Sequence, residues 1–364
     1  MSATINVIVI DDSAFMRKSL SLMLESDPQI KVIATARDGK EGVEKVMQLK
    51  PDVVTLDVEM PVMDGLTALG IIMKEMPLPV LMVSSITTDG AKATIDALNL
   101  GAVDFIPKEL SYVSVNIAKI KDDLIAKVKH IARTKAVHFR IQRIRSRSGA
   151  MARSKAAAST ATRADTIHPR HDLSAVLVGV STGGPFALLQ MIPKLPADFP
   201  LGIAVVQHMP PKFTRSMAER LNGLSQVEVR EAQEGDRMEP GVVLIAPGGQ
   251  HLTFHRNGSG VHVSTPIEPA GTLYRPCVDV MMSSAVEAFQ EPLLGVIMTG
   301  MGKDGLEGLK KIKQRNGVVF AQDEDTCVVY GMPKAAVDEG IVDNVLPLDE
   351  LAAALVQATK GKQQ

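Results

Sequence analysis

The strongest constraint on the fold is an alternation of short apolar, β-branched runs with segments of helical periodicity. Five such runs occur in the N-terminal part of the chain, at residues 5–10, 30–36, 52–56, 79–85 and 102–107. Runs that are apolar throughout are typical of strands buried on both faces of a parallel sheet. The pattern therefore predicts an α/β domain with a doubly wound, flavodoxin-like parallel sheet.

A second set of apolar runs starts near residue 173 and predicts another, larger α/β domain with a doubly wound parallel sheet. Its strand-like runs are 175–180, 201–207, 241–247, 293–300 and 317–322. Its helix-like segments are 184–192, 212–222, 277–289 and 347–359. Residues 251–265 alternate between polar and apolar around an Asn-Gly pair, which predicts a β-hairpin.

The stretch between the two sets is strongly basic. Residues 127–171 carry about a dozen lysines and arginines against the single acidic residue Asp165, and apolar periodicity fades after Ile144. This composition predicts a flexible linker between a first domain, 1–126, and a second domain, 172–364. A nucleic-acid-binding arm would also be basic, but the interleaved aromatic residues are missing, so we expect no nucleic-acid partner.

Composition excludes other classes of protein. The formal net charge is −1, and no apolar run approaches the roughly 18 residues needed to span a bilayer. We therefore expect no membrane insertion. The N-terminus has neither a basic start nor a small-residue cleavage site, which favours a cytoplasmic protein. The only two cysteines, Cys277 and Cys327, lack zinc-site spacing, and we expect reduced thiols.

Polar side chains follow successive strands of the first predicted sheet. Asp11 and Asp12 end the first run, and Asp57 ends the third. Like charges at short distance raise each other's pKa, so this cluster favours a bound cation, and oxygen ligands suit Mg²⁺. Ser84 and Lys108 end the fourth and fifth runs and add a hydroxyl and an ammonium to the same edge. The five groups predict a phosphoryl-acceptor site with Asp57 as the nucleophile.

Acidic residues at strand ends also cap helices, and for Asp12 or Asp57 alone that interpretation is the better one. The motifs "VIDDS", "LDVEMPVMDG", "VSS" and "DFIPK" resemble the receiver domain of two-component response regulators over residues 4–125. Glu109 departs from the family, which usually has proline after the preceding lysine. The resemblance implies these roles: phosphorylation at Asp57, Mg²⁺ ligation by Asp11, Asp12 and Asp57, the switch hydroxyl at Ser84 and phosphate contact by Lys108.

The first strand of the second domain ends in "GVSTGG", which places Ser181 among glycines. The G-x-S-x-G spacing is typical of a nucleophile elbow, where glycines permit a tight strand-to-helix turn. A phosphate-binding loop is the alternative. A Walker loop needs a lysine that is absent here, and a dinucleotide fingerprint needs glycine where Ser181 stands. The motif alone leaves both interpretations open.

A serine nucleophile needs a base, and eight histidines are available. Seven lie in or beside the linker or in the predicted hairpin, where we expect mobile or solvent-facing side chains: His130, His138, His168, His171, His251, His255 and His262. His208 instead ends a buried-type strand, at the same kind of edge as Ser181. Asp304 follows a third such strand and is a candidate to orient the base, although a helix N-cap also explains it.

The motifs "GVSTGGP", "VVQHMP", "APGGQHL", "YRPCVDVMMSSA" and "MTGMGKDG" resemble the chemotaxis protein-glutamate methylesterases of the CheB family. The resemblance implies a serine esterase that hydrolyses glutamate methyl esters on chemoreceptors, releases methanol and deamidates receptor glutamines. It also implies a chemotaxis histidine kinase as phosphodonor and no cofactor for the esterase chemistry. The implied site residues are Ser181 as nucleophile, His208 as base, Asp304 as orienting carboxylate, Met301 as oxyanion donor and Thr182 as a shaping residue. Cys277 is assigned no chemistry.

A tethered receiver predicts regulation. The tether raises its effective concentration, so a weak contact could cover the catalytic face until Asp57 is phosphorylated. Two alternatives belong to other classes of protein. A DNA-binding response regulator is supported only by the basic linker, and a non-catalytic adaptor would use the second domain only to bind receptors.

Overall fold

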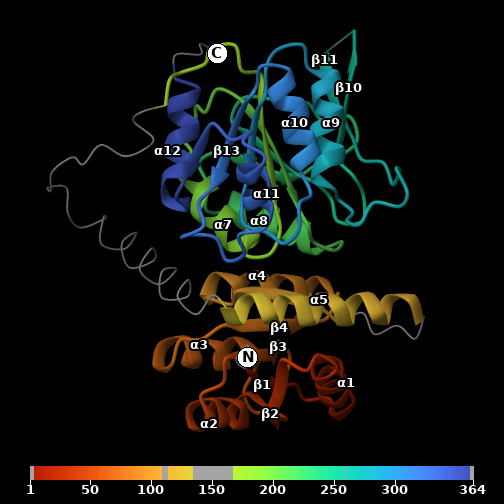
Figure 1. Cartoon of the computed structure of the whole chain (residues 1–364), viewed down its shortest axis with the longest axis vertical. Coiled ribbons are helices and arrows are strands. Elements are labelled where there is room, and N and C mark those ends of the chain that lie inside the picture. Colours follow the sequence, from red (N-terminus) through yellow and green to blue (C-terminus); the bar gives the residue numbers. More distant parts are fainter. Residues whose placement is uncertain (1–3, 109–113, 134–166, 259, 361–364) are drawn as a thin grey trace, which may run out of the picture. The chain divides into compact units, whose positions relative to one another are not determined.

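The computed structural model describes residues 4–108, 114–133, 167–258 and 260–360, and it divides into two compact units, Met1–Arg143 and Ile144–Gln364 (Figure 1). Most of the predicted linker, and Glu109, lie outside the described residues. Residues 127–133 continue helix α5 (Ser114–Arg133), which runs beyond the predicted domain end at residue 126. Within the described ranges, no helix combines the length and apolarity needed to cross a membrane.

The first unit contains a parallel five-stranded sheet in the order β2-β1-β3-β4-β5. Its strands are β1 (Ile5–Ile10), β2 (Ile30–Ala36), β3 (Val53–Asp57), β4 (Val80–Ser84) and β5 (Asp104–Pro107). Its helices before α5 are α1 (Ala14–Glu25), α2 (Gly39–Leu49), α3 (Gly65–Glu75) and α4 (Thr88–Leu100). Each of these four begins after a side chain that accepts a backbone N–H, namely Ser13, Asp38, Asp64 and Thr87.

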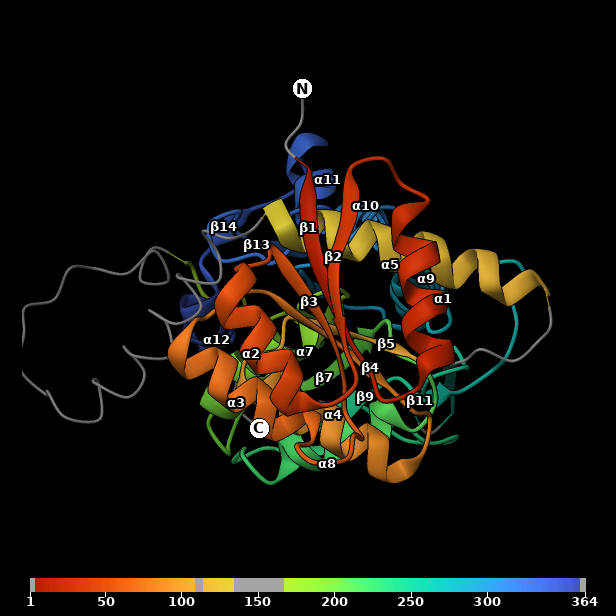
Figure 2. The same cartoon turned by 90° about the horizontal axis from the view of Figure 1, so that it is seen from below.

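Helices cover both faces of this sheet, as expected for a doubly wound domain. Helix α1 packs on α5, whereas α2 and α4 each pack on α3 (Figure 2). Strands β3 and β4 are buried along their whole length, which explains why their sequences are apolar runs without alternation.

The second unit contains a parallel seven-stranded sheet in the order β14-β13-β12-β6-β7-β9-β8. Its strands are β6 (Ala175–Val180), β7 (Gly202–Gln207), β8 (Glu228–Glu231), β9 (Val242–Ile245), β12 (Leu294–Ile297), β13 (Val318–Gln322) and β14 (Asn344–Leu346). Its α-helices are α7 (Gly184–Met191), α8 (Phe213–Asn222), α9 (Val278–Ala288), α10 (Leu306–Gln314), α11 (Met332–Asp338) and α12 (Leu348–Ala358). A separate antiparallel hairpin pairs β10 (Thr253–Asn257) with β11 (Gly260–Ser264).

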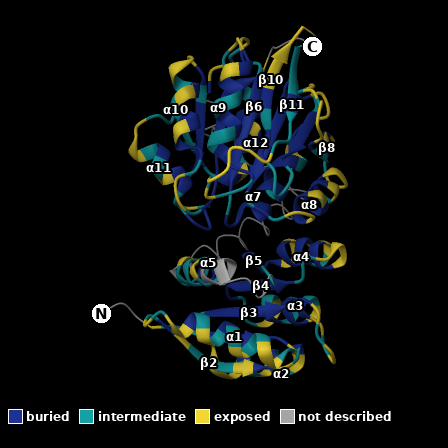
Figure 3. Cartoon of the chain, turned by 90° about the vertical axis from the view of Figure 1, so that its right-hand side faces the viewer, coloured by how far each residue is buried: buried dark blue, intermediate teal, exposed yellow. Residues whose placement is uncertain are grey.

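The predicted fold class is confirmed, and each predicted parallel strand is a strand in the structure. Two strands were missed, β8 and β14, and both lie at the edges of the seven-stranded sheet. Strand β8 reads "EVRE" and has one buried residue, Val229, and β14 has three residues, so neither shows the buried apolar run on which the prediction depends. The central strands are buried and the outer helix faces are exposed (Figure 3).

The order of strands creates a topological switch point in the middle of the larger sheet. The chain passes from β6 to β7 on one side and later places β12 on the other side of β6. The loops after β6 and β12 therefore leave the sheet at its topological switch point, where open α/β sheets form their sites. Ser181 follows β6, His208 follows β7 and Asp304 lies in the loop after β12.

Candidate functional site

The first unit brings three charged side chains together at the carboxyl end of its sheet. Lys108 Nζ lies 2.6 Å from Asp57 Oδ2 and 3.0 Å from Asp11 Oδ2. Asp11 is fully buried and Asp57 is 2% exposed. Asp11, Asp12 and Asp57 each offer a carboxylate oxygen within 4.8 Å of the others, with Asp12 exposed. Three converging carboxylates are a donor set that fits Mg²⁺.

The electrostatics of this cluster favour a cation as well. Burial raises the pKa of Asp57 to about 6, and the charge of Asp11 adds to the effect, although Lys108 opposes it. Burial alone would lower the pKa of Lys108, but the two carboxylates raise it, so the amine is protonated. One ammonium faces two buried carboxylates, and a divalent ion would relieve the remaining repulsion.

Ser84 lies at the end of β4, as the strand pattern predicts, but its hydroxyl is directed toward α4. The side chain is fully buried, and Ser84 Oγ donates to the carbonyl of Gly90 at 3.1 Å. Ser84 O accepts from Lys108 N at 2.7 Å, which ties the two strand ends. Among the described residues, no hydrogen bond joins the Ser84 hydroxyl to Asp57. The structure therefore brings Asp11, Asp12, Asp57 and Lys108 together, with Ser84 beside them and turned toward α4.

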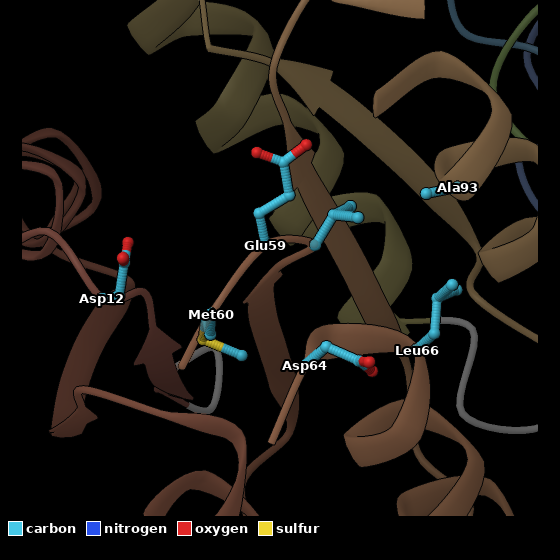
Figure 4. Close-up of a pocket in the computed structure, with 7 residues that line it drawn as sticks. Asp12, Glu59, Met60, Asp64, Leu66 and Ala93 are labelled. Atoms are coloured by element: carbon cyan, nitrogen blue, oxygen red, sulfur yellow. The ribbon is translucent and has the colours of Figure 1, made fainter. Parts of the chain in front are cut away.

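A pocket of about 520 Å³ opens beside the acidic cluster (Figure 4). Asp12 lines one side, and Glu59 and Met60 come from the loop that follows Asp57. Leu66 of α3 and Ala93 of α4 complete the apolar part of the lining. Asp12 therefore belongs both to the acidic cluster and to the lining of an open pocket.

The raised pKa of Asp57 is directly measurable. In metal-free protein we expect its carboxyl carbon to titrate by NMR near pH 6, with the signal assigned through the Asp57→Asn variant. This group contributes stability below its ordinary pKa and loses that contribution as the pH rises through about 6. Mg²⁺ should lower the midpoint because it favours the ionised form. A metal-free midpoint at or below about 4, the ordinary value, would contradict the burial argument.

In the second unit, Ser181 occupies a tight turn between β6 and α7. Gly184 N donates to Ser181 O at 2.8 Å, and Gly183 has φ +77°, a left-handed conformation that favours glycine. A Cβ added at Gly183 would also lie 2.5 Å from Val328 Cβ. The turn therefore needs its glycine, as a strand-to-helix elbow does.

His208 and Asp304 are directly bonded. His208 Nε2 lies 2.8 Å from Asp304 Oδ2, and the two side chains are only 6% and 9% exposed. The ring of Tyr274 is stacked on that of His208, with centroids 4.1 Å apart and planes 14° from parallel. His208 Nδ1 is buried and, among the described residues, has no hydrogen-bond partner.

The carboxylate of Asp304 is held at the N-terminus of α9. Val278 N donates to Asp304 Oδ2 at 2.7 Å, and Asp279 N donates to Oδ1 at 3.0 Å. Cys277 Sγ donates to Oδ1 at 3.2 Å, and burial raises the thiol pKa to about 12, so it stays a neutral donor. Burial opposes ionisation of Asp304, but these N–H groups and His208 hold its pKa below the usual range. Asp304 therefore caps α9, not the helix α10 that follows it.

Ser181 and His208 lie side by side at the carboxyl end of the sheet. Val180 and Gln207, the residues before them, are paired in register between β6 and β7. The Gln207 amide donates to Ser181 O at 3.0 Å and to His208 O at 3.2 Å, which links the two strand ends. Among the described residues, no hydrogen bond joins the Ser181 hydroxyl to the imidazole.

The remaining two predicted residues lie around Ser181. A Cβ added at Gly300 would lie 2.8 Å from Ser181 Cβ, so the segment leading to Met301 runs directly against the serine. Thr182 is buried, and its carbonyl accepts from Thr299 Oγ1 at 2.9 Å. The loops after β6 and β12 are thus bonded together beside the serine.

Sequence reasoning missed several groups of this site and misjudged one histidine. Tyr274 and Cys277 carried no periodic signal, whereas Gln207, a polar residue ending an apolar run, was a signal that could have been used. The expectation that His251 faces solvent is wrong. His251 lies before β10, outside the hairpin, and is fully buried, with its Nε2 3.3 Å from Thr272 Oγ1.

Comparison with known proteins defines the class of each unit. The response regulator receiver domain model matches residues 7–116, and the CheB methylesterase model matches residues 176–355. The chain is therefore a response regulator in which a receiver domain precedes a methylesterase domain.

Full-length relatives define the family. The protein-glutamate methylesterase/protein-glutamine glutaminase 1 of Oleidesulfovibrio alaskensis is 50% identical over 97% of this chain and 99% of its own. The protein-glutamate methylesterase/protein-glutamine glutaminase of Pyrococcus abyssi is 45% identical, and the match covers 98% of this chain and 94% of the relative. A crystal structure of the Thermotoga maritima CheB methylesterase catalytic domain is 43% identical and covers 51% of this chain and 98% of its own, with a TM-score of 0.49. The chain belongs to the protein-glutamate methylesterase/protein-glutamine glutaminase family.

Proposed function

We propose that this protein hydrolyses glutamate methyl esters on chemoreceptors and deamidates receptor glutamines, using Ser181, His208 and Asp304 as a catalytic triad. The observation that carries the proposal is the buried bond between His208 Nε2 and Asp304 Oδ2, at the sheet edge where Ser181 lies on its glycine turn. Nearly full-length relatives that bear both activities in their names support the substrate class.

The hydrogen bonds of His208 support Nδ1 as the ring nitrogen that acts as the base. Asp304 is ionised and can only accept, so His208 Nε2 must carry the proton in their bond. The lone pair of His208 is therefore on Nδ1, the buried atom without a partner among the described residues. The chymotrypsin triad has the opposite arrangement: its histidine Nδ1 is bonded to the aspartate, and Nε2 is the base.

Ester hydrolysis then proceeds in two stages. Ser181 Oγ attacks the ester carbonyl while His208 Nδ1 takes its proton, and the tetrahedral oxyanion is stabilised by backbone N–H groups beside the serine, with Met301 N as our candidate. His208 returns the proton to the departing methoxide oxygen, so that methanol leaves. Water, deprotonated by the same nitrogen, attacks the acyl-enzyme, and His208 returns that proton to Ser181 Oγ as the glutamate carboxyl group leaves.

Deamidation of glutamine follows the same route with ammonia as the leaving group. An amine leaves a tetrahedral intermediate less readily than methoxide, so we expect this reaction to be slower. A neutral ester and a neutral amide both gain negative charge on the carbonyl oxygen, and a single set of oxyanion donors serves both substrates.

The receiver unit supplies regulation in this proposal. Asp57 accepts a phosphoryl group from the chemotaxis histidine kinase, Lys108 neutralises its oxygens, and Ser84 reports the change to α4. Asp11, Asp12 and Asp57 would hold Mg²⁺, which supplies further neutralisation of the phosphoryl charge. Phosphorylation then raises the esterase activity of the tethered domain.

One experiment tests activity and regulation together. Methanol release from methylated receptor membranes is measured for the full chain with and without a small phosphodonor such as acetyl phosphate. We expect release by the wild type to rise with the donor, and release by Asp57→Asn to stay at the basal level. Absence of methanol release under all conditions would overturn the esterase proposal, and equal stimulation of Asp57→Asn would overturn the role of Asp57.

A further inference from the structure

The bond to Asp304 does not by itself fix the orientation of the His208 ring. The hydrogen bond restrains Nε2 and the covalent bond restrains Cβ, but the imidazole can still rock about the line that joins these two atoms. Such a rotation would move Nδ1, the atom that must meet the Ser181 hydroxyl. A second restraint, acting on the plane of the ring, is needed to hold the base in position.

Tyr274 provides a restraint of that kind. Its ring lies nearly parallel to the imidazole, with planes 14° apart and centroids separated by 4.1 Å. Asp304 contacts the edge of the imidazole and Tyr274 covers its face, so the two contacts restrict different motions. The stack also excludes water from one side of a ring that is only 6% exposed.

The chain anchors Tyr274 close to the group that orients the histidine. Three residues further on, Cys277 is the N-cap residue of α9, and Val278 N in the first turn donates to Asp304. Arg275 O accepts from Gly249 N at 3.1 Å, which ties this segment to the loop after β9. A single stretch, residues 274–279, therefore packs against the face of the His208 ring and also binds the carboxylate of Asp304.

The stack has an electronic consequence as well. His208 becomes an imidazolium when it takes the proton of Ser181, and a cation at this distance from an aromatic face is attracted by the ring quadrupole. The attraction is stronger in the charged state than in the neutral one. Tyr274 therefore favours the state that forms during the reaction, and its removal should lower kcat more than it raises KM.

We propose that Tyr274 is a positioning residue of the esterase, whose stacked ring fixes the plane of the His208 imidazole and supports its protonated form. The inference rests on the proposed function, because it assigns His208 the role of base. It goes beyond the triad in assigning a task to the aromatic side chain of the "YRPCVD" segment.

The test compares Tyr274→Ala with Tyr274→Phe in the full chain. We expect Tyr274→Ala to lower kcat for methanol release roughly 10- to 100-fold, with KM changed less than about threefold, since small displacements of a catalytic group carry costs of this size. Tyr274→Phe keeps the aromatic face and should stay within about threefold of the wild type in both constants. Leu273→Ala, a change at the adjacent 66%-exposed residue, should leave both constants within about twofold.

A second measurement follows the histidine without substrate. The Nε2 proton of His208, bonded to Asp304, should give a downfield NMR resonance in the wild type and in Tyr274→Phe, and a broadened or absent one in Tyr274→Ala. Equal kcat for the wild type, Tyr274→Phe and Tyr274→Ala would overturn the proposal. An equal loss of kcat in Tyr274→Ala and Leu273→Ala would overturn it as well. Failure of the esterase function would appear instead as an inactive wild type with its resonance intact.

Discussion

Replacing Ser181 by alanine is expected to abolish methanol release, with a loss of kcat of roughly 10⁴-fold or more. Alanine lacks the hydroxyl that forms the acyl-enzyme, and His208 then has no proton to accept from the chain. The fold should be retained, because the hydrogen bonds that Ser181 makes with other described residues use its backbone: N donates to Thr299 O, and O accepts from Gly184 N and the Gln207 amide.

A serine-reactive phosphonate probe separates this result from misfolding. The probe should label the wild type at Ser181 and leave Ser181→Ala unlabelled. Phosphorylation of Asp57 by a small phosphodonor should proceed at the same rate in both proteins. Esterase activity retained by Ser181→Ala would show that the nucleophile lies elsewhere. The glycine turn would then be better explained as a phosphate-binding loop.

Replacing Asp304 by asparagine is expected to lower kcat by roughly 10⁴-fold, although the two side chains have nearly the same shape. The neutral amide carries donors as well as an acceptor, so it no longer obliges His208 to keep its proton on Nε2 and its lone pair on Nδ1. It also removes a negative charge that stabilises the imidazolium. The melting temperature should fall too, because four donors converge on this carboxylate: His208 Nε2, Val278 N, Asp279 N and Cys277 Sγ.

Asp343→Asn is a matched control for the effect on stability. Asp343 accepts from Val319 N at 2.7 Å and pairs with Lys313, but Val319 lies near the start of β13, at the amino end of the sheet. We expect this variant to lower the melting temperature while leaving kcat within about twofold of the wild type. If Asp304→Asn kept near-normal kcat, the carboxylate would have only a structural role, as the acceptor at the N-terminus of α9.

Most of the predicted site residues lie at, or directly after, the carboxyl end of a strand, whereas Asp304 lies in the loop after β12. Buried parallel strands are apolar throughout, so the first polar residue after each run marks the carboxyl edge of the sheet. This pattern predicts Asp57 at the end of β3, Ser181 directly after β6 and His208 directly after β7. It failed for His251, where polar and apolar alternation was extended beyond the true start of the hairpin at Thr253.

The amino-acid sequence by itself determined that two parallel α/β sheets form, because side-chain periodicity encodes which faces of each element are buried. It also determined which chemical groups gather at the sheet edges. Only the tertiary structure decided the contacts among those groups, since they depend on strand order: β12 lies beside β6, and the N-terminus of α9 reaches Asp304. The stacking of Tyr274 on His208 and the choice of Nε2 for Asp304 arise from such contacts between distant segments, which no local pattern records.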